Sequence, residues 1–157
     1  MKLSTTFILT FITFVVSLFA YMSYTPKEVE HIHYHAGFIV YVDGVRQDYS
    51  DYKYMNLTPC TQEELKPTKE EEQIEKAHLH DGVGDVVHVE QAGSVWGDLF
   101  KNIGVTLPAD LPVLSEVIEP NSSIVISVGT PVDKPEKVSL EHIKEVEAKS
   151  ELCGIGE

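Results

Sequence analysis

The chain has 157 residues, enough for one domain with its own hydrophobic core. Its 25 acidic and 12 basic residues give a formal net charge of -13, and its Lys and Arg residues form no cluster. Both features argue against a nucleic-acid partner, because phosphate binding needs a basic face. An acidic surface favours solubility and the attraction of cations.

The first segment, residues 3–24, is uncharged and follows Lys2. Its length matches the roughly 20 residues that cross a bilayer as a helix. The preceding positive charge predicts that this end stays in the cytoplasm and that the rest of the chain lies outside. Residues 1–24 are therefore expected to be a single-pass membrane anchor, or a signal segment whose cleavage would give a secreted protein, and 25–32 a tether.

The next stretch reads HYHAGFIVYVDG and predicts a strand over 33–42. The dipeptide Asp43-Gly44 is a strong hairpin signal, so a second strand is expected over 45–49.

A polar excursion over 56–77 follows, rich in Glu, Lys, Thr and Pro. Within it, Thr68 and Glu71 have the spacing of a capping box, which predicts a short surface helix over 69–77.

The segment 85–90, DVVHVE, alternates as a strand does. Ser94 is expected to cap a helix that ends at Gly104. One apolar stripe of this helix has helical spacing and should face the core: Trp96, Leu99, Phe100 and Ile103.

A continuous apolar strand is expected over 123–128, and a last helix from Leu140 to about residue 152. Ser139 should cap this helix, with Leu140, Ile143 and Val146 facing inward. Residues 33–157 thus predict an α+β domain with a small mixed sheet, β-grasp-like in its order of elements, and two packed helices.

Six of the seven histidines fall into two groups, around the sequences HIHYH and HLHD. Alternate residues of a strand share a face, so each H-x-H pair should point one way, and a tight turn can bring His88 back beside them. Imidazole suits zinc, copper, nickel and iron. The predicted metal ligands are five histidines, with two carboxylates as further ligands or support: His33, His35, His78, His80, His88, Asp81 and Glu90.

Two other interpretations of the histidines stay open, a pH-sensing cluster and structural hydrogen bonding. His31 is expected to be peripheral, and His142 an ordinary surface residue. The two cysteines, Cys60 and Cys153, form an even pair, which favours one disulfide in an extracytoplasmic compartment over two free thiols.

Four segments together resemble a group of small exported or membrane-tethered bacterial proteins: HYHAGFIVYVDG, HLHDGVGDVVHVE, WGDLFKNIG and SIVISVG. The resemblance covers most of 33–154. It implies no particular activity, but it implies that the HYH and HLHD residues belong to one shared pattern.

The sequence therefore predicts a membrane-anchored extracytoplasmic domain that binds zinc or copper without catalysis. A small metal-dependent enzyme, with Asp81 or Glu90 as general base, is one alternative. A surface interaction module with structural histidines is the other.

Overall fold

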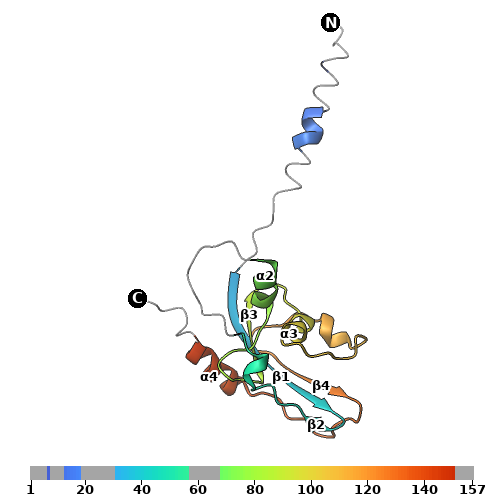
Figure 1. The fold of residues 1–157 in the computed structure, drawn as a ribbon, viewed down its shortest axis with the longest axis vertical. Coiled ribbons are helices and arrows are strands. Elements are labelled where there is room, and N and C mark those ends of the chain that lie inside the picture. The colour runs from blue at the N-terminus through green and yellow to red at the C-terminus, as the bar shows by residue number, and fades with distance from the viewer. Residues whose placement is uncertain (1–6, 8–12, 19–30, 57–67, 151–157) are drawn as a thin grey trace.

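The computed structural model describes residues 7, 13–18, 31–56 and 68–150, which are called the described residues below. They form an α+β domain on a mixed four-stranded sheet, as the sequence predicts. Figure 1 shows the elements, which follow one another in the order β1 (His31–Val42), β2 (Val45–Arg46), η1 (Tyr52–Tyr54), α2 (Lys69–Lys76), β3 (Val86–Gln91), α3 (Trp96–Asn102), η2 (Pro112–Ser115), β4 (Ser123–Val128) and α4 (Leu140–Ser150).

Strand β1 is the centre of the sheet, because every other strand pairs with it. The first part of β1 pairs with antiparallel β3, and its end pairs with β2 across the Asp43-Gly44 turn. Strand β4 runs parallel to β1, with its residues opposite 37–42. Both turn residues have positive φ angles, as the predicted tight hairpin requires.

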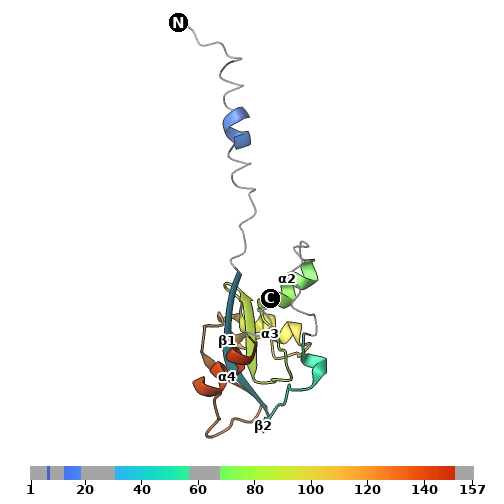
Figure 2. The same cartoon turned by 90° about the vertical axis from the view of Figure 1, so that its left-hand side faces the viewer.

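The sheet buries both of its faces, and each face has its own hydrophobic core. Helix α3 packs on one face, where Phe38 of β1 meets Trp96 and Phe100. Helix α4 packs on the other face, where Ile39 lies in one cluster with Ile143. Figure 2 shows α4 in front of β1 and α3 behind it. Because side chains alternate along a strand, the odd-numbered residues of β1 point toward the α4 side.

Strand β2 is shorter than predicted and ends at Arg46. The backbone N–H of Gln47 still donates to the Val40 carbonyl at 2.8 Å, but the chain then turns. The Asp48 carboxylate accepts from the backbone N–H of Ser50 at 2.9 Å, a local turn that competes with the strand.

Helix α3 buries its predicted apolar stripe, but Ser94 does not cap it. The Ser94 hydroxyl donates to the Gln91 carbonyl at 2.8 Å instead. The Asp98 carboxylate accepts from the backbone N–H of Val95 at 3.1 Å and so serves the helix N-terminus. Gly104 follows the helix with a φ of 69°, as a C-terminal glycine should.

The other two helices start as predicted. Thr68 and Glu71 form the capping box of α2, with hydrogen bonds of 3.2 and 2.6 Å. The Ser139 hydroxyl accepts from the backbone N–H of His142 at 3.1 Å and caps α4. The prediction that Leu140 faces inward is wrong, because this residue is 51% exposed. One helical turn separates it from Lys144, with which it shares the outer side of α4.

Several predictions fall largely or wholly outside the described residues. Of residues 3–24, the structure describes residue 7 and the helical residues 13–18. In the part of the chain that the structure describes, no helix is both long and apolar enough to span a membrane. Cys60 and Cys153 are not described. The anchor, the tether and the disulfide therefore stay predictions.

Candidate metal centre

The histidines of the two sequence groups meet on one face of the sheet, in a row across three neighbouring backbone segments. In this row His35 of β1 lies opposite His88 of β3. On the other edge of β3, His78 pairs with His88, with backbone hydrogen bonds of 3.0 and 2.9 Å. His88 therefore lies between the two H-x-H pairs. The sequence alone predicts that His88 lies near HLHD, but not that it lies between the two pairs.

The five histidine rings are close together, and His88 is their common neighbour. Its ring centroid is 4.5 Å from that of His33 and 4.8 Å from those of His35, His78 and His80. The five do not form a single group of mutually close nitrogens. They form two triads that share His88, and within each triad one ring nitrogen per residue lies within 4.8 Å of the others.

We call the first group triad A, which consists of His33, His35 and His88, and the second triad B, which consists of His78, His80 and His88. Triad A spans the β1–β3 ladder, and triad B spans β3 and the segment before it. His35, His78 and His88 are nearly buried, with exposed fractions of 1, 7 and 7%. His33 is exposed and His80 half-buried, so each triad reaches the surface through one member.

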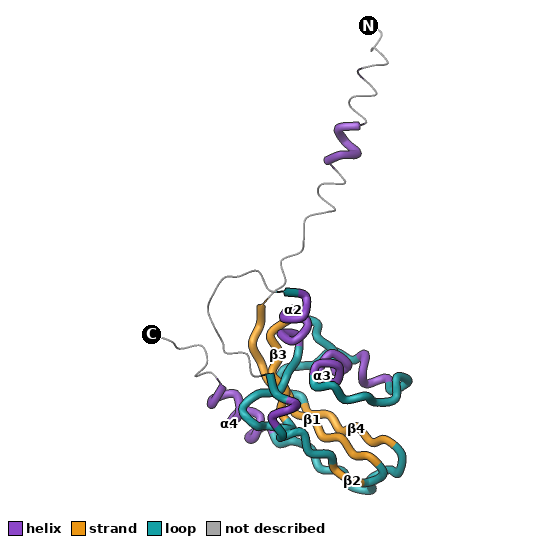
Figure 3. Tube along the Cα trace, viewed as in Figure 1, coloured by secondary structure: helices purple, strands orange, loops and turns teal. Residues whose placement is uncertain are grey.

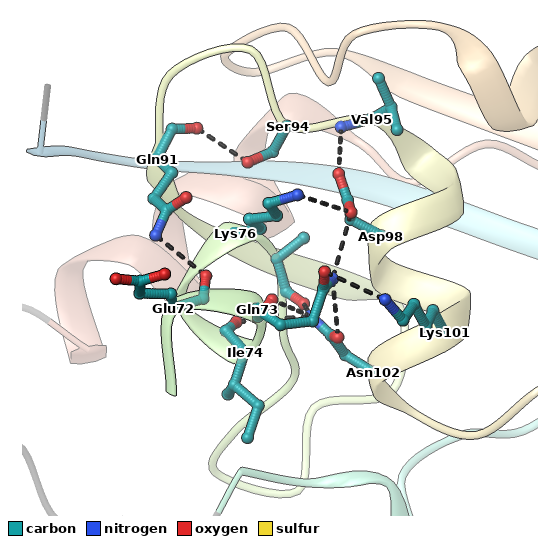
Figure 4. Close-up of polar contacts among 11 residues, drawn as sticks. Glu72, Gln73, Ile74, Lys76, Gln91, Ser94, Val95, Asp98, Lys101 and Asn102 are labelled. Carbon is teal, nitrogen blue, oxygen red and sulfur yellow. Dashed lines mark hydrogen bonds and ion pairs between the residues drawn. The ribbon is translucent and has the colours of Figure 1, made fainter. Parts of the chain in front are cut away.

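Polar contacts between α2 and α3 hold the segment that carries His78, as Figure 4 shows for most of the participants. The side-chain amide of Asn102 donates to the carbonyls of Gln73 and Ala77, both at 2.7 Å. The Gln73 carbonyl is among the last carbonyls of α2, which have no partner within the helix, and Ala77 directly follows the helix. His78 completes this end, because its Nδ1 lies 3.1 Å from the Ile74 carbonyl.

A tight turn joins His80 to β3 and brings His88 back beside HLHD. Asp81 and Gly82 both have positive φ angles, of 57° and 70°. Gly84 lies against the backbone of the segment after β2, so close that a Cβ atom there would be 2.5 Å from the Tyr49 carbonyl carbon. The turn thus depends on glycine at positions 82 and 84.

Hydrogen bonds fix the proton positions on His35. The Ser150 hydroxyl donates to the Glu147 carbonyl at 2.9 Å, so its oxygen accepts from Nε2–H of His35 at 3.1 Å. In neutral imidazole the other nitrogen, Nδ1, then carries a lone pair. This buried Nδ1 has no hydrogen-bond partner among the described residues. The same reasoning applies to His78, whose Nδ1–H donates to a carbonyl and leaves Nε2 as the lone pair.

A chain of contacts runs from Asp81 through His80 to His88. The Asp81 carboxylate lies 2.6 Å from Nδ1 of His80, which places the proton of neutral His80 on that nitrogen. Nε2 of His80 then accepts from Nδ1–H of His88 at 2.9 Å. Nε2 of His88 is left as a buried lone pair without a hydrogen-bond partner among the described residues. This nitrogen lies 3.6 Å from a carboxylate oxygen of Glu90, and the negative charge of the carboxylate favours a cation nearby.

Burial and mutual repulsion keep the inner histidines neutral. Removal from water lowers the pKa of His88 to about 2 and the pKa values of His35 and His78 to about 4. Neighbouring imidazoles contribute to this lowering of the pKa at all three residues, since a second positive charge nearby is unfavourable. Neutral imidazole is the form that binds metal ions.

The sequence did not indicate two of the residues that position the site, Ser150 and Asn102. Ser150 contacts His35 from α4, and Asn102 of α3 contacts the end of α2 just before His78, so no local motif marks either residue. His142 lies apart from both triads and its Nε2 is 3.1 Å from the Asp85 carboxylate. The side chain of His31 is not described.

The structure thus defines a small α+β domain whose histidine groups have the donor types and spacing to hold a metal ion. Comparison with known proteins adds no identification: no family model matches the chain, and no match is found among curated proteins or among solved structures.

Proposed function

We propose that this protein is a membrane-tethered extracytoplasmic domain that binds a transition metal ion, zinc or copper, without catalysing a reaction. The main observation that supports metal binding is in triad A. His35 and His88 each keep a buried imidazole lone pair that lacks a hydrogen-bond partner among the described residues. Such groups cost free energy unless something satisfies them, and a metal ion satisfies both at once.

The hydrogen bonds around the triads also support a metal site. Metal-binding histidines commonly donate their second ring N–H to a carbonyl, hydroxyl or carboxylate, which fixes the tautomer. His35, His78 and His80 have this arrangement, with Ser150, the Ile74 carbonyl and Asp81 as acceptors. Asp81 then acts behind His80 rather than as a direct ligand. Glu90 is near enough to Nε2 of His88 to join triad A.

The donor set narrows the choice of metal. Imidazole nitrogens favour zinc, copper and nickel over calcium or magnesium, which prefer oxygen ligands.

Metal analysis of the chain, purified without a histidine tag, tests this proposal. We expect at least one equivalent of zinc or copper per chain and a rise in melting temperature when metal is added. Replacing His35 and His80 together by Ala removes a ligand from each triad, and should abolish both stoichiometric binding and the metal-induced rise.

His142→Ala is the matched control, since His142 lies outside both triads and should leave binding unchanged. The melting temperatures of both metal-free variants show whether they fold. Unchanged binding by a folded His35→Ala/His80→Ala variant, or no binding by the unsubstituted chain, would leave the histidines with a structural role.

The cellular location belongs to the same proposal and rests on the sequence. The uncharged residues 3–24 after Lys2, and the resemblance to exported or membrane-tethered bacterial proteins, support an anchor with the domain outside the cytoplasm. A β-grasp-like arrangement is also proposed, and the parallel pairing of the first and last strands supports it.

A reporter fused after Glu157 measures the topology. We expect activity from a reporter that works only outside the cytoplasm, and none from one that works only inside. The opposite pair of results would refute the proposed location without affecting the metal site.

A further inference from the structure

We infer that the domain binds two metal ions, one in each triad, and that the ring of His88 bridges them as an imidazolate. This inference rests on the proposed metal-binding function and specifies its stoichiometry and geometry. His88 is the one residue common to the two triads. An imidazole ring has two nitrogens on different sides, so a single ring can serve two ions only by offering a different nitrogen to each.

The contacts of His88 assign its two nitrogens to the two triads. Its Nδ1 lies 2.9 Å from Nε2 of His80, in triad B. Its Nε2 lies toward Glu90, 3.6 Å away, on the other side of the ring. Glu90 follows His88 by two residues on β3 and so shares its face, beside the β1 histidines of triad A.

The hydrogen bonds of three other ligands leave one ring nitrogen of each without a proton. In triad A, Nδ1 of His35 is free of a proton because Nε2–H donates to Ser150. In triad B, Nε2 of His78 and Nε2 of His80 are free because each Nδ1–H donates to an oxygen. His35, His78 and His80 therefore have the required tautomer without any change in protonation.

The proton balance follows from these assignments. Triad A can take an ion on Nε2 of neutral His88, and no proton is lost. Triad B holds a proton where its ion would lie, on Nδ1 of His88 and shared with His80. The second ion replaces this proton, which goes to solvent, and His88 becomes an imidazolate with one ion on each nitrogen. The two positive ions stabilise that negative charge.

Copper(II) provides the experiment, because two copper(II) ions joined by an imidazolate couple magnetically. We expect the full chain to bind two equivalents of copper(II) and to lose most of its electron paramagnetic resonance signal at low temperature. His33→Ala breaks triad A and His80→Ala breaks triad B. Each variant should bind one equivalent and give the full signal of one isolated copper ion.

These two substitutions suit the test because His33 is exposed and His80 is half-buried, which limits the effect on folding. Circular dichroism checks that both variants fold. Both keep Cys60 and Cys153, so a signal lost through reduction by thiols would be lost in the variants as well. His142→Ala should behave as the unsubstituted chain.

The outcomes separate the inference from the proposed function. One equivalent of copper in the unsubstituted chain overturns the bridge and leaves the metal-binding function standing. Two equivalents with the full signal of two isolated ions also overturn the bridge, because the ions then lie in separate sites. If the unsubstituted chain binds no copper, both the bridge and the proposed function are wrong.

Discussion

Without metal, the domain should lose stability steadily as the pH falls below about 6.5, the ordinary pKa of histidine. Folding lowers the pKa of His88 to about 2 and those of His35 and His78 to about 4, mainly through burial. Below pH 6.5 the unfolded chain therefore binds more protons than the folded one, and protons favour unfolding. Each of these histidines adds a loss of up to about 1.4 kcal/mol per pH unit, until the pH reaches its folded pKa.

Denaturant unfolding in the presence of a chelator, between about pH 7.5 and pH 4.5, measures this effect. His88→Gln is the informative variant, because glutamine keeps polar groups at this position but does not titrate. Its stability should fall less steeply with decreasing pH than that of the unsubstituted chain. A free energy of unfolding that stays constant, or rises, from neutral pH down to about pH 5 would contradict the burial of neutral imidazoles.

Gly84→Ala is expected to damage both the fold and the metal site. A Cβ atom at this position would overlap the backbone N of Ser50 and lie 2.5 Å from the carbonyl carbon of Tyr49. Backbone cannot move aside as a flexible side chain can, so we expect a loss of about 1–3 kcal/mol or more in unfolding free energy. Metal affinity should fall as well, because the turn that contains Gly84 connects His80 to His88.

Gly44→Ala is the matched control. Gly44 lies in the β1–β2 turn, and a Cβ atom there would meet nothing within 4 Å, although its φ of 81° disfavours a side chain. The Gly44→Ala substitution should lower the free energy of unfolding by about 1 kcal/mol and leave metal affinity unchanged. Equal effects of the two substitutions on metal binding would show that the Gly84 turn does not position the histidines.

Local patterns in the sequence predict most of the elements correctly. The turn at Asp43-Gly44, the capping box at Thr68 and the apolar stripe on Trp96 each depend on neighbouring residues, and all three are present. Errors occur where the same few residues can make a different local contact or face another way. The Ser94 hydroxyl bonds to the Gln91 carbonyl instead of capping α3. Leu140 has helical spacing to Ile143 but faces outward from the first turn of α4.

The histidine site shows a second limit, which concerns contacts distant in the chain. Alternation along a strand predicts that His33 and His35 share a face, and the structure agrees. Strand order is not a local property, so the sequence could not show that β3 separates the two H-x-H pairs and that His88 therefore belongs to both triads. The contribution of Ser150 was hidden for the same reason, since it acts on His35 from the far end of the domain.

The parallel pairing of β1 with β4 limits the order in which the domain can fold. Figure 3 shows that β4 reaches β1 only after a long connection that follows α3 and includes η2. One edge of the central strand has no partner until β4 has been made, and α4, which supplies Ser150, comes later still. Contacts so distant in the chain form slowly. The histidine centre should therefore be completed late, so metal loading would follow synthesis of the whole chain rather than accompany it.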